Sequence, residues 1–326
     1  MLNLKSKFHS VIGVTMMFGA FGVLAANVQD VVNAVSYDSY RSYLGYPGDT
    51  VNPLYTQAGD SRYYTSGQHD LARTNIVNHF TGLGLTTTLD PFTYSGSTYK
   101  NVVAVLPGTV RPNDIYVIGA HFDSVNCPGA DDNASGVAGV MEAARVLAGF
   151  DFEATLAFIA FDVEEMRLIG SAAYASAAKA RGDTILGMIS LDMIAYNTAG
   201  KNTAEIYGRT TSDTVKLALA EAVQTYGGLT TTVLGQLDYS DHASFEANGY
   251  PAALLIEADG NPYYHTVTDN VNTPNYIDYL FATNMTKGTV GYVANVAILV
   301  PEPGTLWLLV FAAVMAGKSR RSPGRG

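Results

Sequence analysis

Residues 119–136 read GAHFDSVNCPGADDNASG. This stretch follows the apolar run 115–118 and precedes a segment with the pattern of a helix, 135–148. A turn-rich segment between a strand and a helix lies at the carboxyl end of the strand, where open α/β sheets collect their ligands. The stretch contains one His and three Asp, which are side chains that bind divalent metal ions. We therefore expect a metal site at this crossover.

Strand patterns and helix patterns alternate after the crossover. The expected strands are 115–121, 154–161, 185–194, 231–234 and 252–256, and the expected helices are 135–148, 171–180, 212–226, 242–248 and 276–298. This alternation predicts an α/β fold, a three-layer α/β/α sandwich with a mixed, largely parallel central sheet.

The residues before the crossover are less regular. Residues 68–83 have helical spacing, and 86–92 and 100–106 resemble two strands joined by a Ser-Gly-Ser turn. Residues 27–67 are rich in Tyr, Ser, Gly and Asp, which predicts an ordered but irregular N-terminal arm. Since no repeat or change of composition divides residues 27–300, we expect a single domain there.

The first 26 residues have the features of a secretory signal peptide. Lys5 and Lys7 precede the apolar run Val11–Leu24, and Ala25 and Ala26 offer small residues for cleavage. A membrane anchor is the alternative, but the run is short against the ~20 residues of a spanning helix. We expect export.

Residues 301–326 contain a second targeting pattern. Pro301-Glu302-Pro303 precedes the short apolar run Thr305–Ala316 and a basic end. This order resembles the PEP-CTERM sorting signal of Gram-negative bacteria, which implies transient membrane association through the tail, recognition by exosortase-like sorting machinery and removal of the tail. The alternative is a buried C-terminal helix, which the prolines and the basic end disfavour. The expected location after processing is the periplasm, the cell surface or the extracellular space.

The charge and the cysteine content narrow the classes of partner. The chain has 19 basic and 29 acidic residues. The two ends contain six of the basic residues and one acidic residue, so the middle has a net charge of about −15, which disfavours nucleic acid as a partner. Cys127 is the only cysteine and excludes an internal disulfide. An incidental role for Cys127 is favoured over that of a thiolate ligand or nucleophile.

Candidate metal ligands recur at successive strand ends. They are His121, Asp123, Asp131 and Asp132 at the first, Glu164 and Glu165 at the next, Asp192 at the one after, and His265 with Asp269 in a late loop. A helix cap explains any one of these acids, but not all of them together. So many carboxylates repel one another unless cations neutralise them, as two metal ions about 3.5–4 Å apart would. In Glu164-Glu165 the side chains point to opposite sides, so one can bind metal while the other accepts a proton. A surface salt-bridged pair is the alternative.

Taken in chain order, these motifs resemble a known family. They are Gly119-Ala-His121-Phe-Asp123, Asp131-Asp132-Asn133-Ala-Ser-Gly136, Glu164-Glu165, Leu191-Asp192-Met193, Ser240-Asp241-His242-Ala243, and His265 with Asp269. The order resembles that of secreted co-catalytic dizinc aminopeptidases of the bacterial leucyl aminopeptidase type. The resemblance implies two Zn²⁺ ions, one on His121 and Asp192 and the other on Glu165 and His265, with Asp132 bridging.

The resemblance also implies roles for residues around the ligands. Glu164 would be the general base, and Asp123 and Asp269 would each orient one of the two histidines. Tyr264 occupies the position where some relatives have a Tyr that polarises the substrate carbonyl. Met166-Arg167 departs from the family, which usually has Gly two residues after the Glu pair.

The expected activity is hydrolysis of N-terminal residues from peptides through a water activated by two zinc ions. A carboxypeptidase or glutaminyl-cyclase-like enzyme with one zinc is an alternative on the same fold. A catalytically inactive surface or matrix binding protein is an alternative from another class. The complete set of five ligands favours the aminopeptidase.

Overall fold

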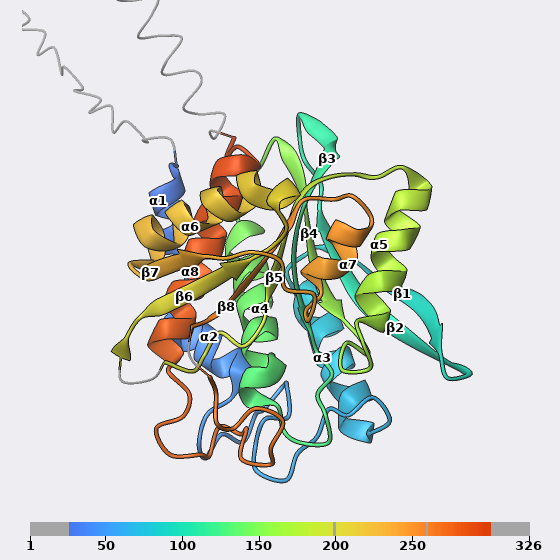
Figure 1. Ribbon diagram of the computed structural model, residues 1–326, viewed down its shortest axis with the longest axis vertical. Helices are drawn as coiled ribbons and strands as arrows, with labels where there is room; N and C mark the ends of the chain where they lie inside the picture. The colour runs from blue at the N-terminus through green and yellow to red at the C-terminus, as the bar shows by residue number, and fades with distance from the viewer. Residues whose placement is uncertain (1–25, 198–199, 259, 301–326) are drawn as a thin grey trace, which may run out of the picture. The chain divides into compact units, whose positions relative to one another are not determined.

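Eight strands form one sheet in this computed structural model, which describes residues 26–197, 200–258 and 260–300 (Figure 1). Their order across the sheet is β1-β2-β4-β3-β5-β8-β6-β7. The strands are β1 Thr86–Tyr94, β2 Ser97–Leu106, β3 Arg111–His121, β4 Ala154–Phe161, β5 Thr184–Leu191, β6 Thr203–Tyr207, β7 Thr230–Val233 and β8 Ala252–Glu257.

The four central strands, β4, β3, β5 and β8, run parallel to one another. Strands β1 and β2 are antiparallel, β2 pairs antiparallel with β4, and β6 pairs antiparallel with β8. The predicted mixed, largely parallel sheet is therefore confirmed. Because the central strands point the same way, their carboxyl ends meet at one edge of the sheet.

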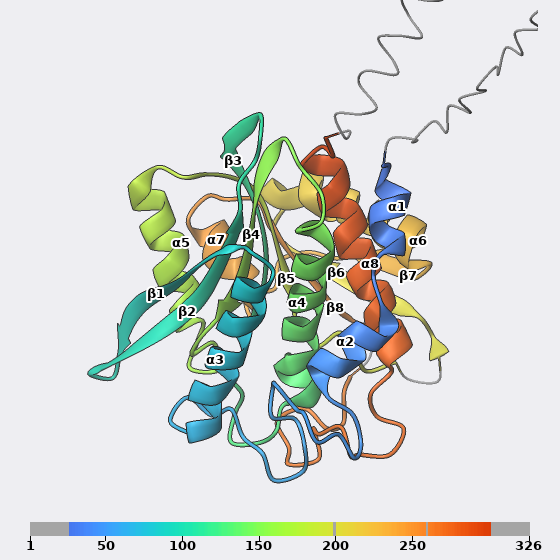
Figure 2. The same cartoon turned by 180° about the vertical axis from the view of Figure 1, so that it is seen from behind.

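Helices cover both faces of the sheet. They are α1 Val28–Asn33, α2 Tyr37–Leu44, α3 Gly67–Gly82, α4 Gly136–Leu147, α5 Ile169–Arg181, α6 Asp213–Gly227, α7 His242–Ala247 and α8 Tyr279–Val296. Helices α5 and α7 lie on the face seen in Figure 1, and α3, α4 and α8 cover the other face, which Figure 2 shows from behind. The predicted three-layer sandwich is thus confirmed.

Strand β4 illustrates why the sheet is buried. All eight of its residues are buried, and its sequence ATLAFIAF is a nearly continuous apolar run. A strand covered by helices on both faces needs such a run, because both sets of side chains lie in apolar surroundings. Helix α4 is buried almost as completely, since it packs between the sheet and α8.

Several elements differ from their predicted form. Strand β6 was missed, because five residues with a half-buried alternating pattern are a weak signal. The N-terminal arm contains two short helices, which Asn27 and Ser36 cap with their side chains. Helix α8 begins at Tyr279 and not at Tyr276, because the Asp278 side chain caps its first turn.

The two expected targeting segments fall on residues 1–25 and 301–326, which lie outside the described residues. Within the part of the chain that the structure describes, no helix has both the length and the hydrophobicity to cross a membrane.

Candidate metal centre and active site

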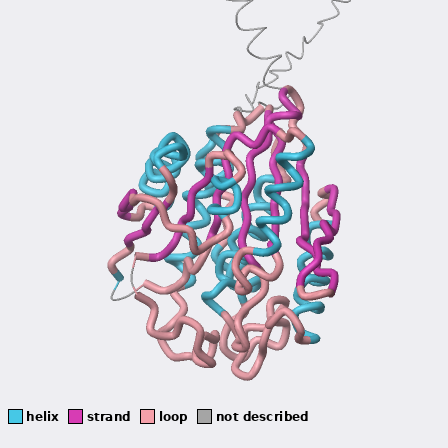
Figure 3. The backbone as a smooth tube through the Cα atoms, turned by 45° about the vertical axis from the view of Figure 1, so that its right-hand side comes forward, coloured by secondary structure: helices cyan, strands magenta, loops and turns pink. Residues whose placement is uncertain are grey.

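The candidate ligands come from separate loops at the carboxyl edge of the sheet. Figure 3 shows these loops gathered at one end of the molecule. His121 is the last residue of β3, Glu164 and Glu165 follow β4, and Asp192 follows β5. Asp132 lies in an irregular turn, Ala130–Ser135, that leads into α4. His265 lies in the loop after β8 and has a left-handed backbone with φ of 58°.

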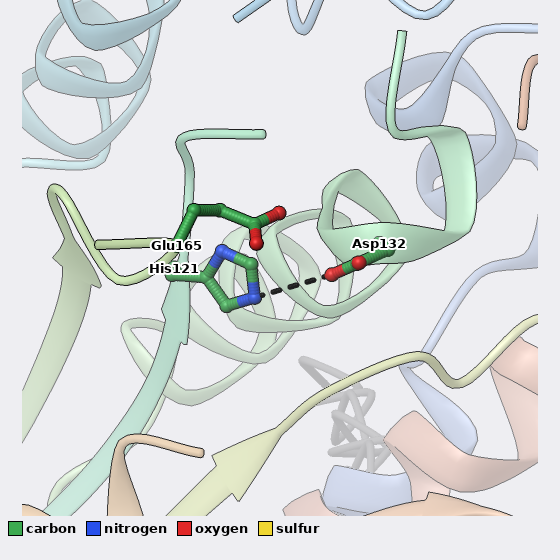
Figure 4. A group of neighbouring side chains, drawn as sticks. All are labelled: His121, Asp132 and Glu165. Atoms are coloured by element: carbon green, nitrogen blue, oxygen red, sulfur yellow. Dashed lines mark ion pairs between the residues drawn. The ribbon is translucent and has the colours of Figure 1, made fainter. Parts of the chain in front are cut away.

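Asp132 lies between the two histidines. Its Oδ1 is 3.4 Å from Nε2 of His121, and its Oδ2 is 3.0 Å from Nε2 of His265. Figure 4 shows Asp132 facing His121, with Glu165 beside them. One carboxylate that presents one oxygen to each histidine has the arrangement of a bridging ligand.

Two further carboxylates complete the donor set. Oδ1 of Asp192 is 3.5 Å from Nε2 of His121, and Oε2 of Glu165 is 3.2 Å from Nε2 of His265. Tetrahedral zinc with bonds of ~2.0 Å places its ligand atoms about 3.3 Å apart. The nitrogen and oxygen donors and their spacing therefore fit zinc.

The site contains two overlapping groups of three donors. His121, Asp132 and Glu165 form one group, and His121, Glu164 and Asp192 form the other, with ligand atoms in each within 4.8 Å of one another. His265, which was predicted as a ligand, has a 37 % exposed side chain and approaches from the outer side. The structure thus brings all five predicted ligands and Glu164 together.

The acidic surroundings favour positive charge on both histidines. Hydrogen bonds to Asp132 and Glu165 raise the pKa of His265 to about 10. Burial opposes the charging of His121, but Glu164 and Asp192 outweigh it and raise the pKa of His121 well above its ordinary value. Burial likewise opposes ionisation of Asp132, yet the two histidines hold its pKa well below the ordinary value. The same negative charge that holds protons on the histidines would attract a divalent cation in their place.

Glu164 is set apart from the proposed bridge. Its side chain is buried, and its Oε2 is 3.8 Å from Nε2 of His121. Burial raises its pKa well above the ordinary value, which gives the carboxylate a stronger tendency to accept a proton.

Asp123 lies against Nδ1 of His121, as predicted, and it also binds the turn that carries the Glu pair. Nδ1 of His121 is 3.2 Å from the Asp123 main-chain oxygen and 3.6 Å from its carboxylate. The Asp123 carboxylate accepts hydrogen bonds from the main-chain N–H groups of Glu164 and Glu165, at 3.0 and 3.2 Å. Asp123 therefore holds the turn of the Glu pair.

Asp269 holds the turn that carries Asp132. Its carboxylate accepts hydrogen bonds from the main-chain N–H groups of Asp131 and Asp132, at 2.8 and 3.1 Å, and from the hydroxyl of Tyr276 at 2.9 Å. These three bonds, and not the predicted contact with a histidine, are what the described residues show for the Asp269 carboxylate.

Asp131, which had no predicted task, is part of a buried network. It accepts hydrogen bonds from the main-chain N–H of Ala195 and from the side-chain amide of Asn261, both at 2.8 Å. The same amide of Asn261 donates to the Tyr276 hydroxyl. Sequence reasoning missed Asn261 and Tyr276, since neither lies in a motif and only the fold brings them together.

A cavity of about 370 Å³ opens beside the donor set. Four of the five proposed ligands, His121, Asp132, Glu165 and Asp192, line it together with Glu164. The rest of the lining is largely apolar and includes Met193, Leu237, Tyr239, Leu254 and Ile256. Met193 belongs to the Leu191-Asp192-Met193 motif, but the other four lie in no motif, so sequence reasoning did not find them.

Tyr264 also lines the cavity. Its side chain is 50 % exposed, and its ring stacks on that of His265 with 3.8 Å between the centroids. Tyr264 is thus placed where a substrate would contact it.

Among the described residues, neither Cys127 nor His242 belongs to a group of side chains that could hold a metal ion. Burial raises the pKa of the Cys127 thiol to about 12, so the thiolate form is rare. His242 is fully buried at the start of α7, and burial lowers its pKa to about 4. The complete burial of His242 indicates a packing role.

A family model described as "Peptidase family M28" matches residues 101–287. "Leucine aminopeptidase 1" of Trichophyton rubrum is 32 % identical over 222 residues, which cover 60 % of this chain and 58 % of the relative. The chain thus spans little more than half the length of this curated relative.

Two solved structures share the fold. The Legionella pneumophila LapA aminopeptidase is 23 % identical, with a TM-score of 0.71 over 83 % of this chain and 74 % of that one. A Bacteroides thetaiotaomicron glutaminyl cyclase is 18 % identical, with a TM-score of 0.67 over 80 % of this chain and 98 % of that one. At these identities the likeness concerns the fold alone, so the reaction must be argued from the site.

Proposed function

Because the chain belongs to peptidase family M28, we propose that it is a zinc-dependent aminopeptidase that hydrolyses N-terminal residues from peptides. The observation that carries the proposal is the position of Asp132, which presents one carboxylate oxygen to His121 and the other to His265. A single bridging carboxylate between two sets of donors supports a dinuclear centre, whereas a one-zinc enzyme needs only one set.

Five residues would hold the metal pair. Asp132 would bridge, His121 and Asp192 would bind one zinc, and Glu165 and His265 would bind the other. When bound, the zinc pair supplies Lewis-acid chemistry, which polarises a scissile carbonyl and makes water nucleophilic at neutral pH.

Glu164 would move the proton of the reaction. Its buried carboxylate borders the cavity, so it can accept a proton from the attacking water and pass it to the departing amine. The hydrogen bond from its main-chain N–H to Asp123 fixes the backbone from which this carboxylate projects. Tyr264, on the rim, would orient the substrate carbonyl.

The apolar wall of the cavity supports a preference for apolar N-terminal residues. A volume of about 370 Å³ accommodates a side chain such as that of leucine or methionine. Met193, Leu254 and Ile256 would contact that side chain, and the carboxylates opposite would attract the free amine.

The proposal includes export. The support is the signal-peptide pattern of residues 1–26 and the PEP-CTERM-like pattern of residues 301–326. Exosortase-like machinery would act on the tail, and the peptidase domain, residues 27–300, would work in the periplasm, at the cell surface or outside the cell.

Hydrolysis of aminoacyl anilides by the purified protein tests the function. We expect release of the anilide from leucyl and methionyl substrates, little release from aspartyl substrates, and loss of activity with a chelator that zinc reverses. A substrate blocked at its amine should be inert. The proposal fails if the zinc-reconstituted protein hydrolyses none of these, and ring closure of an N-terminal glutamine would indicate a cyclase instead.

A further inference from the structure

Arg62, in the N-terminal arm, is fully buried, and its guanidinium donates hydrogen bonds to main-chain oxygens. Its Nε donates to Phe122 at 2.7 Å, and its Nη2 donates to Gly129 at 2.7 Å. Its Nη1 donates to Pro128 at 2.5 Å and to Leu54 at 2.9 Å. Within the described ranges, no carboxylate forms an ion pair with this guanidinium.

The carbonyl groups that Arg62 binds adjoin the proposed metal ligands. Phe122 follows His121 directly, and Pro128 and Gly129 lead into the turn that contains Asp132. Arg62 therefore joins the two ends of the loop 122–129, which lies between a proposed terminal ligand and the proposed bridging ligand. Arginine is the only type of amino acid whose side chain has five N–H donors in a rigid fork, and this geometry suits the task.

The same turn is held from its other side by Asp269. The Arg62 cation donates to the carbonyl oxygens of residues 128 and 129, while the Asp269 side chain accepts from the N–H groups of residues 131 and 132. The turn is thus held by hydrogen bonds at both of its ends. The hydrogen bonds from the Arg62 cation are charge-assisted, and such bonds are about twice as strong as neutral ones.

Gly129 allows the guanidinium to approach so closely. Its φ is 59°, and a Cβ there would lie 2.2 Å from the Asp132 main-chain oxygen and 3.1 Å from Nη2 of Arg62. Any larger residue would push the turn away from Arg62.

A buried cation without a paired carboxylate is costly unless nearby charge offsets it. Burial lowers the pKa of Arg62, while the field of Asp269, Asp123 and Asp132 acts in the opposite direction. These acids belong to the metal centre and its supports. The acidic site that Arg62 adjoins therefore offsets part of the cost of its burial.

We propose that Arg62 is a positioning residue for the metal centre, which sets the separation of His121 and Asp132 through the main chain before metal binds. The inference rests on the proposed zinc function. It assigns a task to the N-terminal arm, which lies outside the region 101–287 that the family model matches.

Zinc affinity of an Arg62→Lys variant tests the proposal. Lysine keeps the charge but cannot reach four carbonyl oxygens, so we expect zinc affinity, measured by competition with a chelator, to fall about 10–100-fold. The visible spectrum of the Co²⁺-substituted variant should change as well, because the donors move. Wild-type affinity together with a wild-type spectrum would overturn the proposal.

Arg145→Gln is the matched control. Nη2 of Arg145 donates to the main-chain oxygen of Ala34 at 2.6 Å, so this residue also ties the arm to the domain but contacts no part of the metal turn. We expect Arg145→Gln to keep wild-type zinc affinity. An equal loss of affinity in both variants would show that general loosening of the arm is responsible, and would refute a specific role for Arg62.

Ser124→Ala provides a milder test if Arg62→Lys does not fold. Oγ of Ser124 accepts from the Arg62 main-chain N–H at 3.1 Å and donates to the Cys127 main-chain oxygen at 2.8 Å. The variant should lose zinc affinity several-fold, and unchanged affinity would count against the proposal. Because zinc binding is measured without peptide, an inactive protein that binds two zinc ions would sink the aminopeptidase function and leave this inference intact.

Discussion

Glu164 and Glu165 are neighbours in sequence with separate surroundings. The carboxylate of Glu165 is 3.2 Å from Nε2 of His265 and also accepts from the Val125 main-chain N–H at 3.0 Å. That of Glu164 is buried on the His121 side, 3.8 Å from its Nε2. The bend and turn that follow β4 direct the two side chains to different sides of the site. One carboxylate can therefore bind metal while the other stays free for proton transfer.

The two glutamates should respond differently to substitution. Glu164→Gln keeps the shape but cannot accept the proton, so kcat should fall about 10²–10⁴-fold while zinc content stays near two per chain. Glu165→Gln should lose zinc. Leucyl anilide hydrolysis and elemental analysis measure the two quantities. If Glu164→Gln lost the metal and Glu165→Gln kept it, the two roles would have to be exchanged.

His242 makes stability depend on pH. Burial holds its pKa at about 4 in the folded protein, whereas an unfolded histidine has a pKa of about 6.5. Between these values the unfolded chain binds the additional proton, so His242 destabilises the fold progressively as pH falls from 6.5 to 4. Its contribution amounts to about 2 kcal/mol between pH 7 and pH 5.

The pH effect can be isolated with His242→Phe, which keeps the ring and removes the titration. In excess chelator, so that zinc release does not contribute, the loss of unfolding free energy from pH 7 to pH 5 should be about 2 kcal/mol smaller than in the wild type. Urea unfolding at both pH values measures it. Equal losses in the two proteins would contradict the assignment.

At the scale of elements, helices α6 and α8 approach each other closely. A Cβ at Gly291 of α8 would lie 2.1 Å from Cδ2 of the Tyr226 ring in α6, and one at Gly288 would lie 2.6 Å from Cγ2 of Val223. Glycine weakens a helix by about 1 kcal/mol relative to alanine. Its presence at these positions is explained by the close contact.

Gly291→Ala should therefore destabilise the protein although alanine is the better helix former. We expect a loss of about 1–3 kcal/mol, since the ring of Tyr226 must move out of the interface. Gly82→Ala in α3 is the control, because a Cβ there meets nothing within 4 Å. Urea unfolding of both variants checks the prediction, and a stabilised Gly291→Ala protein would refute the packing argument.

The elements also differ in how well their patterns predicted them. Strand β4 and helix α4 have strong apolar patterns, and both were predicted within one or two residues. Strand β6 has only two buried residues among five, so it was missed. Its place is determined by pairing with β8 and β7, which is a non-local interaction that no short window of sequence contains.

At the scale of the whole molecule, metal bound at the candidate site would couple function to stability. Several carboxylates lie buried at one edge of the sheet, among them Asp123, Asp131, Asp132, Glu164 and Asp192. Without a cation, these groups can relieve their repulsion only by binding protons. Carboxyl groups of the unfolded chain stay ionised at neutral pH, so this uptake of protons has a cost that favours the unfolded chain.

Removal of metal should therefore lower the melting temperature of the whole domain. Zinc present at about 1,000 times its Kd contributes about 4 kcal/mol to the stability of the folded state. Differential scanning calorimetry with chelator and after zinc reconstitution measures the change at constant pH. A melting temperature that does not respond to zinc would contradict binding at this site.

The sequence by itself determined the class of fold and the set of candidate metal ligands. The hydrophobic periodicity that predicts strands and helices depends only on residues that are close in the chain. The order of the motifs places His121, Asp132 and Asp192 after strands whose carboxyl ends must share one edge of the sheet. Only the tertiary structure decided the supports of the site: Arg62 and Asp269 on the metal turn, Asp123 on the glutamate turn, and the apolar wall of the cavity. These contacts join segments far apart in the chain. They also use main-chain N–H and C=O groups, which nearly every residue has, so the sequence does not mark the residues that take part. The physical reason is that strand and helix patterns report local burial, whereas the position of a hydrogen-bonded turn depends on every segment packed around it.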